Sequence, residues 1–353
     1  MPNGKIILDC ERMKYPFTGL YSFCHHLGTA LKKLDDKKVL TFYLPNKEKD
    51  IFGVDSNVII QHSLHKFLMP SLRGYEIWHS TFQGTSYFPS SRKIKKILTV
   101  HDLNFLYDEN KSPQKKSKEL KKLQNKINNS DAVVAISKFV LNDLKNHLRI
   151  EDAKSHVIYN GCNFDSSSMS VQPSFVPDVP FLYTIGTITA KKNFHVLPAL
   201  LQTYEGVLVI SGITQSEEYK EKIIQEARKY HAENRLIFTG PVTEEEKKWY
   251  MQNCEVFVFP SLAEGFGLPV VEAMYLGKPL LLSNRTSLPE IGGDLASYFE
   301  GFDPKEMQSA LANCFKKNNE AQLSEKLKER AKLFDWKNSA TLYLSLYNQI
   351  LNS

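Results

Sequence analysis

Residues 259–284 read FPSLAEGFGLPVVEAMYLGKPLLLSN, and this stretch predicts a strand, a glycine loop, a helix and a second strand, in that order. The apolar run that ends at Phe259 is typical of a buried strand. Pro269 is favoured in the first turn of a helix, and Gly277 followed by Pro279 is a common helix end. Strands that alternate with helices in this way form parallel sheets covered by helices.

The loop between this strand and this helix has the properties of a phosphate-binding site. Its glycines allow the backbone to approach a ligand closely. The amides at a helix N-terminus, together with the positive end of the helix dipole, attract a diphosphate. We expect the backbone of four consecutive residues to contact such a ligand: Gly265, Phe266, Gly267 and Leu268.

Two glutamates, Glu264 and Glu272, flank the glycine loop eight positions apart. Carboxylates accept hydrogen bonds from hydroxyls, so this pair suits the hydroxyls of a sugar and of a ribose. The two residues could equally act as a general acid and a general base. A purely structural interpretation is an exposed loop glutamate and a glutamate that stabilises the helix dipole. Spacing alone leaves these alternatives open.

The rest of the chain also alternates short apolar runs with longer amphipathic ones. The runs predict seven strands between residues 5 and 159 and five more between residues 181 and 283, with helices between most of them. Residues 166–180 are rich in serine and proline and are interpreted as a linker. Each half should therefore be a doubly wound, Rossmann-like parallel sheet, whose ligands bind beyond the carboxyl ends of the strands.

The segment EGFGLPVVE, 264–272, resembles the Glu, seven residues, Glu motif of the retaining glycosyltransferases of family 4, which have the GT-B fold. Residues 183–197, YTIGTITAKKNFHVL, resemble the Gly-Thr to Arg-Lys-Asn block of that family, and residues 279–294 resemble its return strand and loop. The resemblance implies an α/β protein of GT-B type, with two Rossmann-like, doubly wound parallel-sheet domains and an interdomain cleft.

The resemblance also implies a division of labour between the two domains. Residues 1–168 together with 336–353 would form an N-terminal acceptor-binding domain, and residues 169–335 a C-terminal domain that binds the nucleotide-sugar. The enzyme would move a hexose to a glycan or lipid-linked acceptor in bacterial surface polysaccharide or lipopolysaccharide synthesis. Residues 181–294 look most like bacterial mannosyltransferases, so GDP-mannose is the first expected donor and UDP-glucose the main alternative.

Three residues are expected to be catalytic because of the same resemblance. His101 matches a family histidine that lies close to the donor sugar. Lys192 matches a basic residue that would neutralise the leaving diphosphate. Glu264 would hold the transferred sugar. Retention at the anomeric carbon is implied without a carboxylate nucleophile, so we expect front-face attack, in which the leaving diphosphate takes the proton of the acceptor.

Four more residues are expected to bind the donor. Gly19 opens the first helix opposite the diphosphate, and Glu272 would hold the ribose. Thr187 and Lys191 stand where many relatives carry arginine, and a lysine lacks the bidentate fork of a guanidinium group. We expect no cofactor beyond the GDP- or UDP-sugar donor. We also expect no required metal ion, because no Asp-x-Asp motif is present.

The net charge of +6 favours anionic partners. The lysine-rich residues 111–126 are most simply a solvated helix face, and the alternative is a basic surface for anionic lipid or a lipid-diphosphate acceptor. Aromatic residues are not interleaved with these lysines, so we expect no nucleic-acid binding. No apolar run suits a signal peptide or a membrane-spanning helix. The sequence predicts a cytoplasmic protein, with peripheral contact at the inner membrane face left open.

Two other functions remain compatible with these patterns. One is a nucleotide-sugar epimerase or hydrolase on the same fold, which would act without an acceptor. The other is a non-catalytic GT-B subunit that holds a polysaccharide assembly complex together. Thr187 in place of arginine favours the non-catalytic alternative, whereas the intact EGFGLPVVE segment, His101 and Lys192 favour catalysis.

Overall fold

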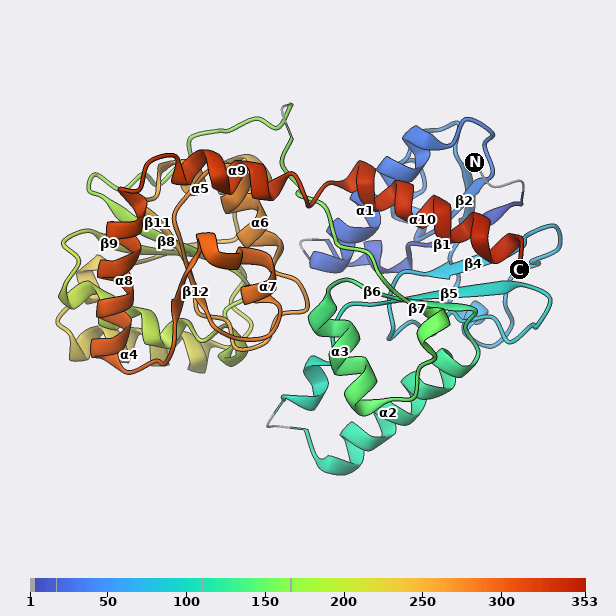
Figure 1. Cartoon of the computed structure of the whole chain (residues 1–353), viewed down its shortest axis with the longest axis horizontal. Helices are drawn as coiled ribbons and strands as arrows, with labels where there is room; N and C mark the ends of the chain where they lie inside the picture. The colour runs from blue at the N-terminus through green and yellow to red at the C-terminus, as the bar shows by residue number, and fades with distance from the viewer. Residues whose placement is uncertain (1–3, 17, 109–110, 166) are drawn as a thin grey trace. The chain divides into compact units, whose positions relative to one another are not determined.

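A computed structural model describes residues 4–16, 18–108, 111–165 and 167–353. The chain divides into two compact units (Figure 1). The first unit is formed by Met1–Asn163 together with Phe334–Ser353, and the second unit by Phe164–Leu333. Each unit contains one parallel sheet with helices packed against it, so the expected class, two Rossmann-like parallel-sheet domains, is confirmed.

The first unit has a seven-stranded sheet in the order β3-β2-β1-β4-β5-β6-β7, and every neighbouring pair is parallel. Its strands are β1 Ile6–Asp9, β2 Leu40–Leu44, β3 Asn57–Ile60, β4 Ile77–Ser80, β5 Lys95–Val100, β6 Ala132–Ala135 and β7 Ser155–Val157. Its α-helices are α1 Gly19–Leu34, α2 Pro113–Asn128, α3 Lys138–His147 and α10 Trp336–Leu351.

The second unit has a six-stranded sheet in the order β10-β9-β8-β11-β12-β13, again with parallel pairs. Its strands are β8 Phe181–Ile185, β9 Val207–Ser211, β10 Leu236–Gly240, β11 Val256–Phe259, β12 Leu280–Ser283 and β13 Ser297–Phe299. Its α-helices are α4 Glu217–Lys229, α5 Glu244–Asn253, α6 Leu268–Tyr275, α7 Leu288–Gly292, α8 Pro304–Asn318 and α9 Leu323–Ala331.

Both sheets reverse their strand order at one point. In the first unit the reversal lies between β1 and β4, and in the second between β8 and β11. The loops that follow these paired strands leave the sheet in opposite directions, and the crevice between them is where doubly wound sheets bind ligands. By this rule, a ligand of the second unit would bind at the loops after β8 and β11.

Two features differ from the sequence-based expectation. Strand β13 was not expected, because its three residues form no apolar run. The segment interpreted as a linker lies along α5 of the second unit. Tyr250 donates a hydrogen bond from its hydroxyl to the carbonyl of Phe175 over 2.6 Å, and Val171 N donates to the carbonyl of Glu245 over 3.3 Å. These bonds fix a stretch whose composition alone indicates flexibility.

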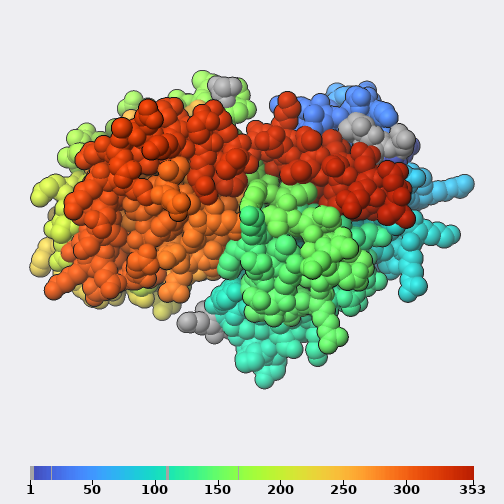
Figure 2. Space-filling model, viewed as in Figure 1, coloured from blue at the N-terminus to red at the C-terminus, as the bar shows by residue number. Residues whose placement is uncertain are grey.

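Helix α10 packs beside α1 and completes the first unit, with part of its length at the molecular surface (Figure 2). Buried hydrogen bonds join the helix to the sheet. The Nδ1 atom of His79 in β4 lies 2.7 Å from the hydroxyl of Tyr347, and its Nε2 atom lies 2.8 Å from Oγ1 of Thr99. The hydroxyl of Tyr343 lies 3.1 Å from the same Thr99 oxygen. Within the described residues, no helix combines the length and apolar character needed to span a bilayer.

The buried His79 should make the first unit sensitive to acid. Burial, with a smaller effect from His101, lowers the pKa of His79 to about 3. In the unfolded chain His79 takes up a proton as the pH falls through about 6.5, whereas in the folded chain it stays neutral. The contribution of neutral His79 to stability is therefore complete above about pH 6.5 and is lost as the pH falls below it. We expect this group to remove about 2 kcal/mol between pH 6.5 and pH 5.

Urea unfolding followed by tryptophan fluorescence at both pH values measures this loss. Glutamine does not titrate, so the His79→Gln variant should start less stable and lose less on acidification. An equal loss in the variant and the parent would show that His79 is not the group responsible.

Candidate functional site in the second unit

The loops after β8 and β11 meet through an ion pair. Strands β8 and β11 are hydrogen-bonded neighbours, so their carboxyl ends lie side by side. Lys192 follows β8, and its Nζ atom lies 2.5 Å from Oε1 of Glu264, which follows β11. The two side chains are only 13% and 14% exposed. Two of the residues expected to be catalytic are therefore in direct contact, although 72 positions separate them.

Several hydrogen bonds hold the Glu264 loop in place. Ser261 donates from Oγ to Oε1 of Glu264 over 2.7 Å, and the backbone amide of Glu264 donates to Oγ1 of Thr286 over 3.1 Å. The hydroxyl of Ser287 donates to the carbonyls of Glu264 and Phe266, over 3.0 and 2.9 Å. Residues that follow β12 thus fix the loop that follows β11.

Glu264 is ionised in this environment. Burial raises the pKa of its carboxyl, but the charges of Lys192 and Lys191 and the hydrogen bonds from Lys192 and Ser261 outweigh burial, so the pKa lies below its usual value. A carboxylate with a low pKa accepts hydrogen bonds and is a poor proton donor. Of the interpretations left open by spacing, binding of hydroxyl groups fits this environment better than a role as general acid.

The backbone near Lys192 leaves room for its side chain. Gly186 has a φ of +156°, and a Cβ atom there would lie 3.1 Å from Cε of Lys192. The Nζ atom also lies 4.9 Å from the ring centre of Phe259, a favourable cation–π contact. Thr187 and Lys191 are exposed in the same loop, and the carbonyl of Lys191 accepts a hydrogen bond from the amide of Leu262 over 2.9 Å.

Helix α6 begins at Leu268, with Pro269 in its first turn as expected, and Gly267 is its N-cap. Gly267 has a φ of +101°, in the left-handed region that favours glycine, and no side chain caps this helix start. Gly265 and Phe266 are buried just before it. The four residues expected to face a diphosphate therefore form one continuous backbone turn into a helix N-terminus.

Glu272 has a different partner from Glu264. It is the fifth residue of α6, and its side chain is 1% exposed. Its Oε1 atom lies 2.9 Å from Nζ of Lys247 in α5, which is also 2.6 Å from Oε2 of Glu244. Lys247 could not be predicted as this partner, because in the run EEEKK it looks like an exposed helix residue.

His101 and Gly19 belong to the first unit. His101 follows β5, is 9% exposed, and its Nε2 atom lies 2.8 Å from the carbonyl oxygen of Thr81. Burial lowers its pKa, despite the opposing hydrogen bond to Thr81 and the charge of Asp102, so the imidazole is neutral near pH 7. Gly19 is the first residue of α1, and a Cβ there would meet no atom within 4 Å. The roles expected for both stay predictions.

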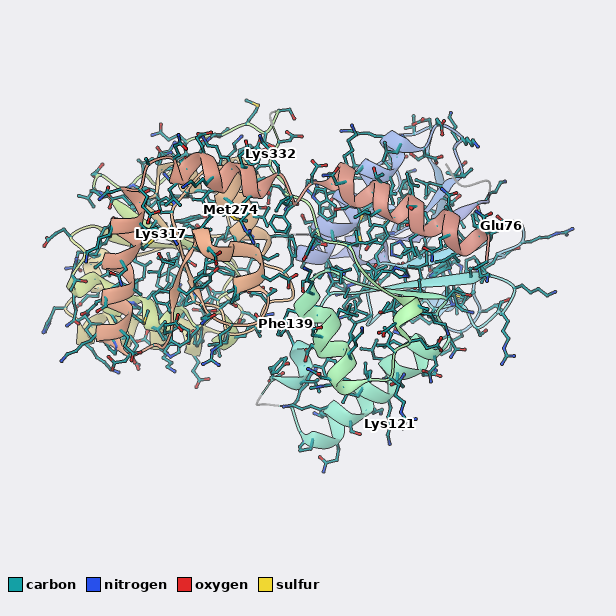
Figure 3. The ribbon with its side chains drawn as sticks, in the orientation of Figure 1. Glu76, Lys121, Phe139, Met274, Lys317 and Lys332 are labelled. Atoms are coloured by element: carbon teal, nitrogen blue, oxygen red, sulfur yellow. The ribbon has the colours of Figure 1, made fainter. Side chains whose placement is uncertain are left out.

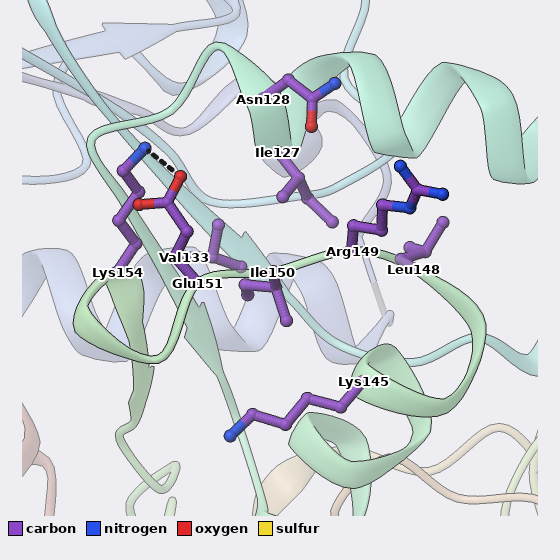
Figure 4. A pocket seen from close by; sticks show the side chains of 9 residues that line it. All are labelled: Ile127, Asn128, Val133, Lys145, Leu148, Arg149, Ile150, Glu151 and Lys154. Atoms are coloured by element: carbon purple, nitrogen blue, oxygen red, sulfur yellow. Dashed lines mark hydrogen bonds and ion pairs between the residues drawn. The ribbon is translucent and has the colours of Figure 1, made fainter.

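None of these residues lines the hollow that the structure shows in the first unit. It has a volume of about 610 Å³ and is lined by the ends of α2 and α3 and by the segment before β7, including Lys145, Arg149 and Lys154 (Figure 4). It opens at the amino ends of β6 and β7, opposite the edge at which such sheets bind substrates. Among the described residues, no group of three or more histidine, cysteine, aspartate or glutamate side chains could hold a metal ion.

Replacing Gly267 by alanine should destabilise the second unit. The left-handed backbone disfavours a side chain, and the added Cβ would lie 2.9 Å from Cδ2 of Leu288. We expect a loss of about 1–3 kcal/mol, measured by urea unfolding. Gly19→Ala is the matched control, because the space around it is open, and it should change stability by less than about 0.5 kcal/mol. Equal effects of the two changes would contradict this account of Gly267.

Comparisons with known proteins agree with this architecture. The family model described as "Glycosyltransferase Family 4" matches residues 55–166, and the model described as "Glycosyl transferases group 1" matches residues 166–334. The O-antigen chain mannosyltransferase B of Escherichia coli is 23% identical over 97% of this chain and 99% of its own length. The serotype-specific mannosyltransferase WbdA of Escherichia coli is 34% identical over 50% of this chain, but over only 23% of its own length.

Solved structures show the same fold at low sequence identity. The sucrose-phosphate synthase of Thermosynechococcus elongatus aligns with a TM-score of 0.78 and 18% identity, over 99% of this chain and 100% of that one. The Anabaena protein HepE, solved in complex with UDP and glucose, aligns with a TM-score of 0.76 and 16% identity, over 98% and 100%. With two family matches that run on from residue 55 to residue 334, the chain belongs to the GT-B glycosyltransferases of the family 4 type.

Proposed function

We propose that this glycosyltransferase moves a hexose, mannose in the first place, from a nucleotide-diphosphate sugar to a glycan or lipid-linked acceptor in surface polysaccharide synthesis. Two mannosyltransferases among its relatives support the sugar, and one of them, the O-antigen chain mannosyltransferase B, also supports the pathway class. The HepE complexes with UDP and UDP-glucose support a nucleotide-sugar donor. The observation that carries the proposal is the Lys192–Glu264 pair beside the start of α6.

Lys192 would serve the leaving diphosphate. A diphosphate carries more negative charge than a carboxylate, so it can draw the ammonium group away from Glu264. The lysine would then neutralise the charge that develops as the glycosidic bond breaks, next to the positive end of the α6 dipole. Lys191, exposed in the same loop, adds charge without the geometry of a guanidinium fork.

Glu264 would take a second role once its lysine has moved. Its carboxylate is ionised, and an ionised carboxylate can accept two hydroxyl hydrogens. It would hold the transferred sugar, while Glu272 holds the ribose of the nucleotide. His101, neutral and already bonded through Nε2, would offer Nδ1 to the sugar. With these groups placed around the donor, front-face attack with retention needs no protein nucleophile, and the diphosphate takes the acceptor proton.

Peripheral contact with anionic lipid is part of the proposal. Helix α2 carries exposed lysines, among them Lys121 (Figure 3). In the loop after β3, three large apolar side chains are highly exposed: Leu64 at 63%, Phe67 at 91% and Leu68 at 79%. Exposed lysines and exposed large apolar side chains are both features that favour the interface of an anionic bilayer. Sedimentation with phosphatidylglycerol vesicles, compared with phosphatidylcholine vesicles, tests this contact.

Lys192→Met should lower kcat/KM at least about a hundred-fold, because removing one group that stabilises transition-state charge typically costs that much. Most of the loss should fall on kcat. Lys229→Met is the control, since Lys229 lies in the same unit with a side chain that is 63% exposed, and its variant should keep parental activity. An unchanged kcat in the Lys192 variant would remove this residue from the site.

A panel of GDP-mannose, UDP-glucose and other nucleotide-sugars, each with and without a glycan acceptor, tests the proposed reaction. Product mass spectrometry should find transfer of the sugar with retained anomeric configuration, and GDP-mannose should give the highest rate. Free sugar released at the same rate without acceptor would instead favour a hydrolase. Absence of binding to every donor in calorimetry would favour a non-catalytic scaffold.

A further inference from the structure

Lys247 is placed where a lysine costs stability. Its side chain is 9% exposed, and lysine is rarely buried unless it is paired. It lies in the first turn of α5, where the helix dipole disfavours positive charge. The helix start does not need it, because Thr243 and Glu246 already form a capping box there. Its location therefore needs another explanation.

The partner of Lys247 supplies that explanation. The Nζ atom lies 2.9 Å from Oε1 of Glu272, whose side chain is 1% exposed, and 2.6 Å from Oε2 of Glu244, whose side chain is 67% exposed. A buried ion pair of this kind is seldom kept for stability, because apolar residues of the same size often do as well. The pair is more readily understood if the charge on Glu272 is itself required.

We propose that Lys247 is a positioning residue that keeps Glu272 ionised and oriented, so that its carboxylate selects a ribose over a deoxyribose in the donor nucleotide. The inference rests on the proposed function, in which Glu272 holds the ribose. An ionised carboxylate only accepts hydrogen bonds, so it matches two neighbouring hydroxyls, whereas a protonated one presents a donor.

The charge of Lys247 is secure at neutral pH. Burial lowers the pKa of its ammonium group, but the charges of Glu272 and Glu244 and the hydrogen bonds to both outweigh burial, so the pKa lies above its usual value. In a site from which water is excluded, a hydrogen bond to a charged group is strong, and its loss is costly. Lys247 of α5 would thus affect which nucleotide Glu272 of α6 binds.

Calorimetry with GDP, UDP and their 2′-deoxy counterparts tests this inference. The parent should bind the ribonucleotide about ten- to a hundred-fold more tightly than the deoxyribonucleotide. Lys247→Met should lose most of that ratio, and Lys247→Arg, which keeps the charge, should retain most of it. Lys247→Gln repeats the test with an uncharged polar side chain if the methionine variant does not fold.

The neighbouring Lys248 provides a matched control. It is buried on the same helix, but its Nζ atom donates to the backbone carbonyl of Ser168 instead of a carboxylate. Lys248→Met should therefore keep the parental ratio. A parental ratio in Lys247→Met, or an equal loss in the Lys248 variant, would overturn the inference and leave the proposed function standing. A parent that binds none of the four nucleotides would overturn both.

Discussion

The second unit depends on one constraint: its strand order reverses between β8 and β11, so two loops far apart in sequence leave neighbouring strands side by side. The Lys192–Glu264 ion pair joins these two loops. Each partner alone would be an isolated charge in a largely buried place, which is unfavourable. Together they place opposite charges beside a helix start that attracts anions.

The two glutamates of the motif have different lysine partners and different burial. Glu264 is held by Lys192 from the loop after β8, and both side chains are partly exposed. Glu272 is held by Lys247 from a neighbouring helix and is almost fully buried. In the proposed function, a diphosphate displaces the first lysine, whereas the second pair is almost fully buried. One site thus combines an exchangeable ion pair with a fixed one.

Much of this arrangement follows from local sequence. Strands β8, β9 and β11 begin and end where the apolar runs do, because a buried parallel strand needs a continuous apolar segment. The glycine loop was predictable because Gly267 and, two positions later, Pro269 indicate a turn into a helix. These signals lie within a few residues of the structure that they specify.

Burial that results from packing between segments far apart in the sequence could not be predicted. Lys247 stands in a run of charges that is typical of an exposed surface, and only the packing of α5 against α6 makes it a buried ion partner. Strand β13 is too short for its own apolar pattern and exists because β12 offers it an open edge. The 166–180 stretch has the composition of a flexible linker, yet its carbonyls meet hydrogen-bond donors from α5.

The discontinuity of the first unit has a consequence for how the protein is made. Residues 334–353, including α10, supply part of its core, whereas the second unit is a single continuous segment. A ribosome releases the chain from its N-terminus, and domains generally fold as units during synthesis. The second unit is therefore complete before the first, in which the face that α10 covers stays exposed until α10 has emerged.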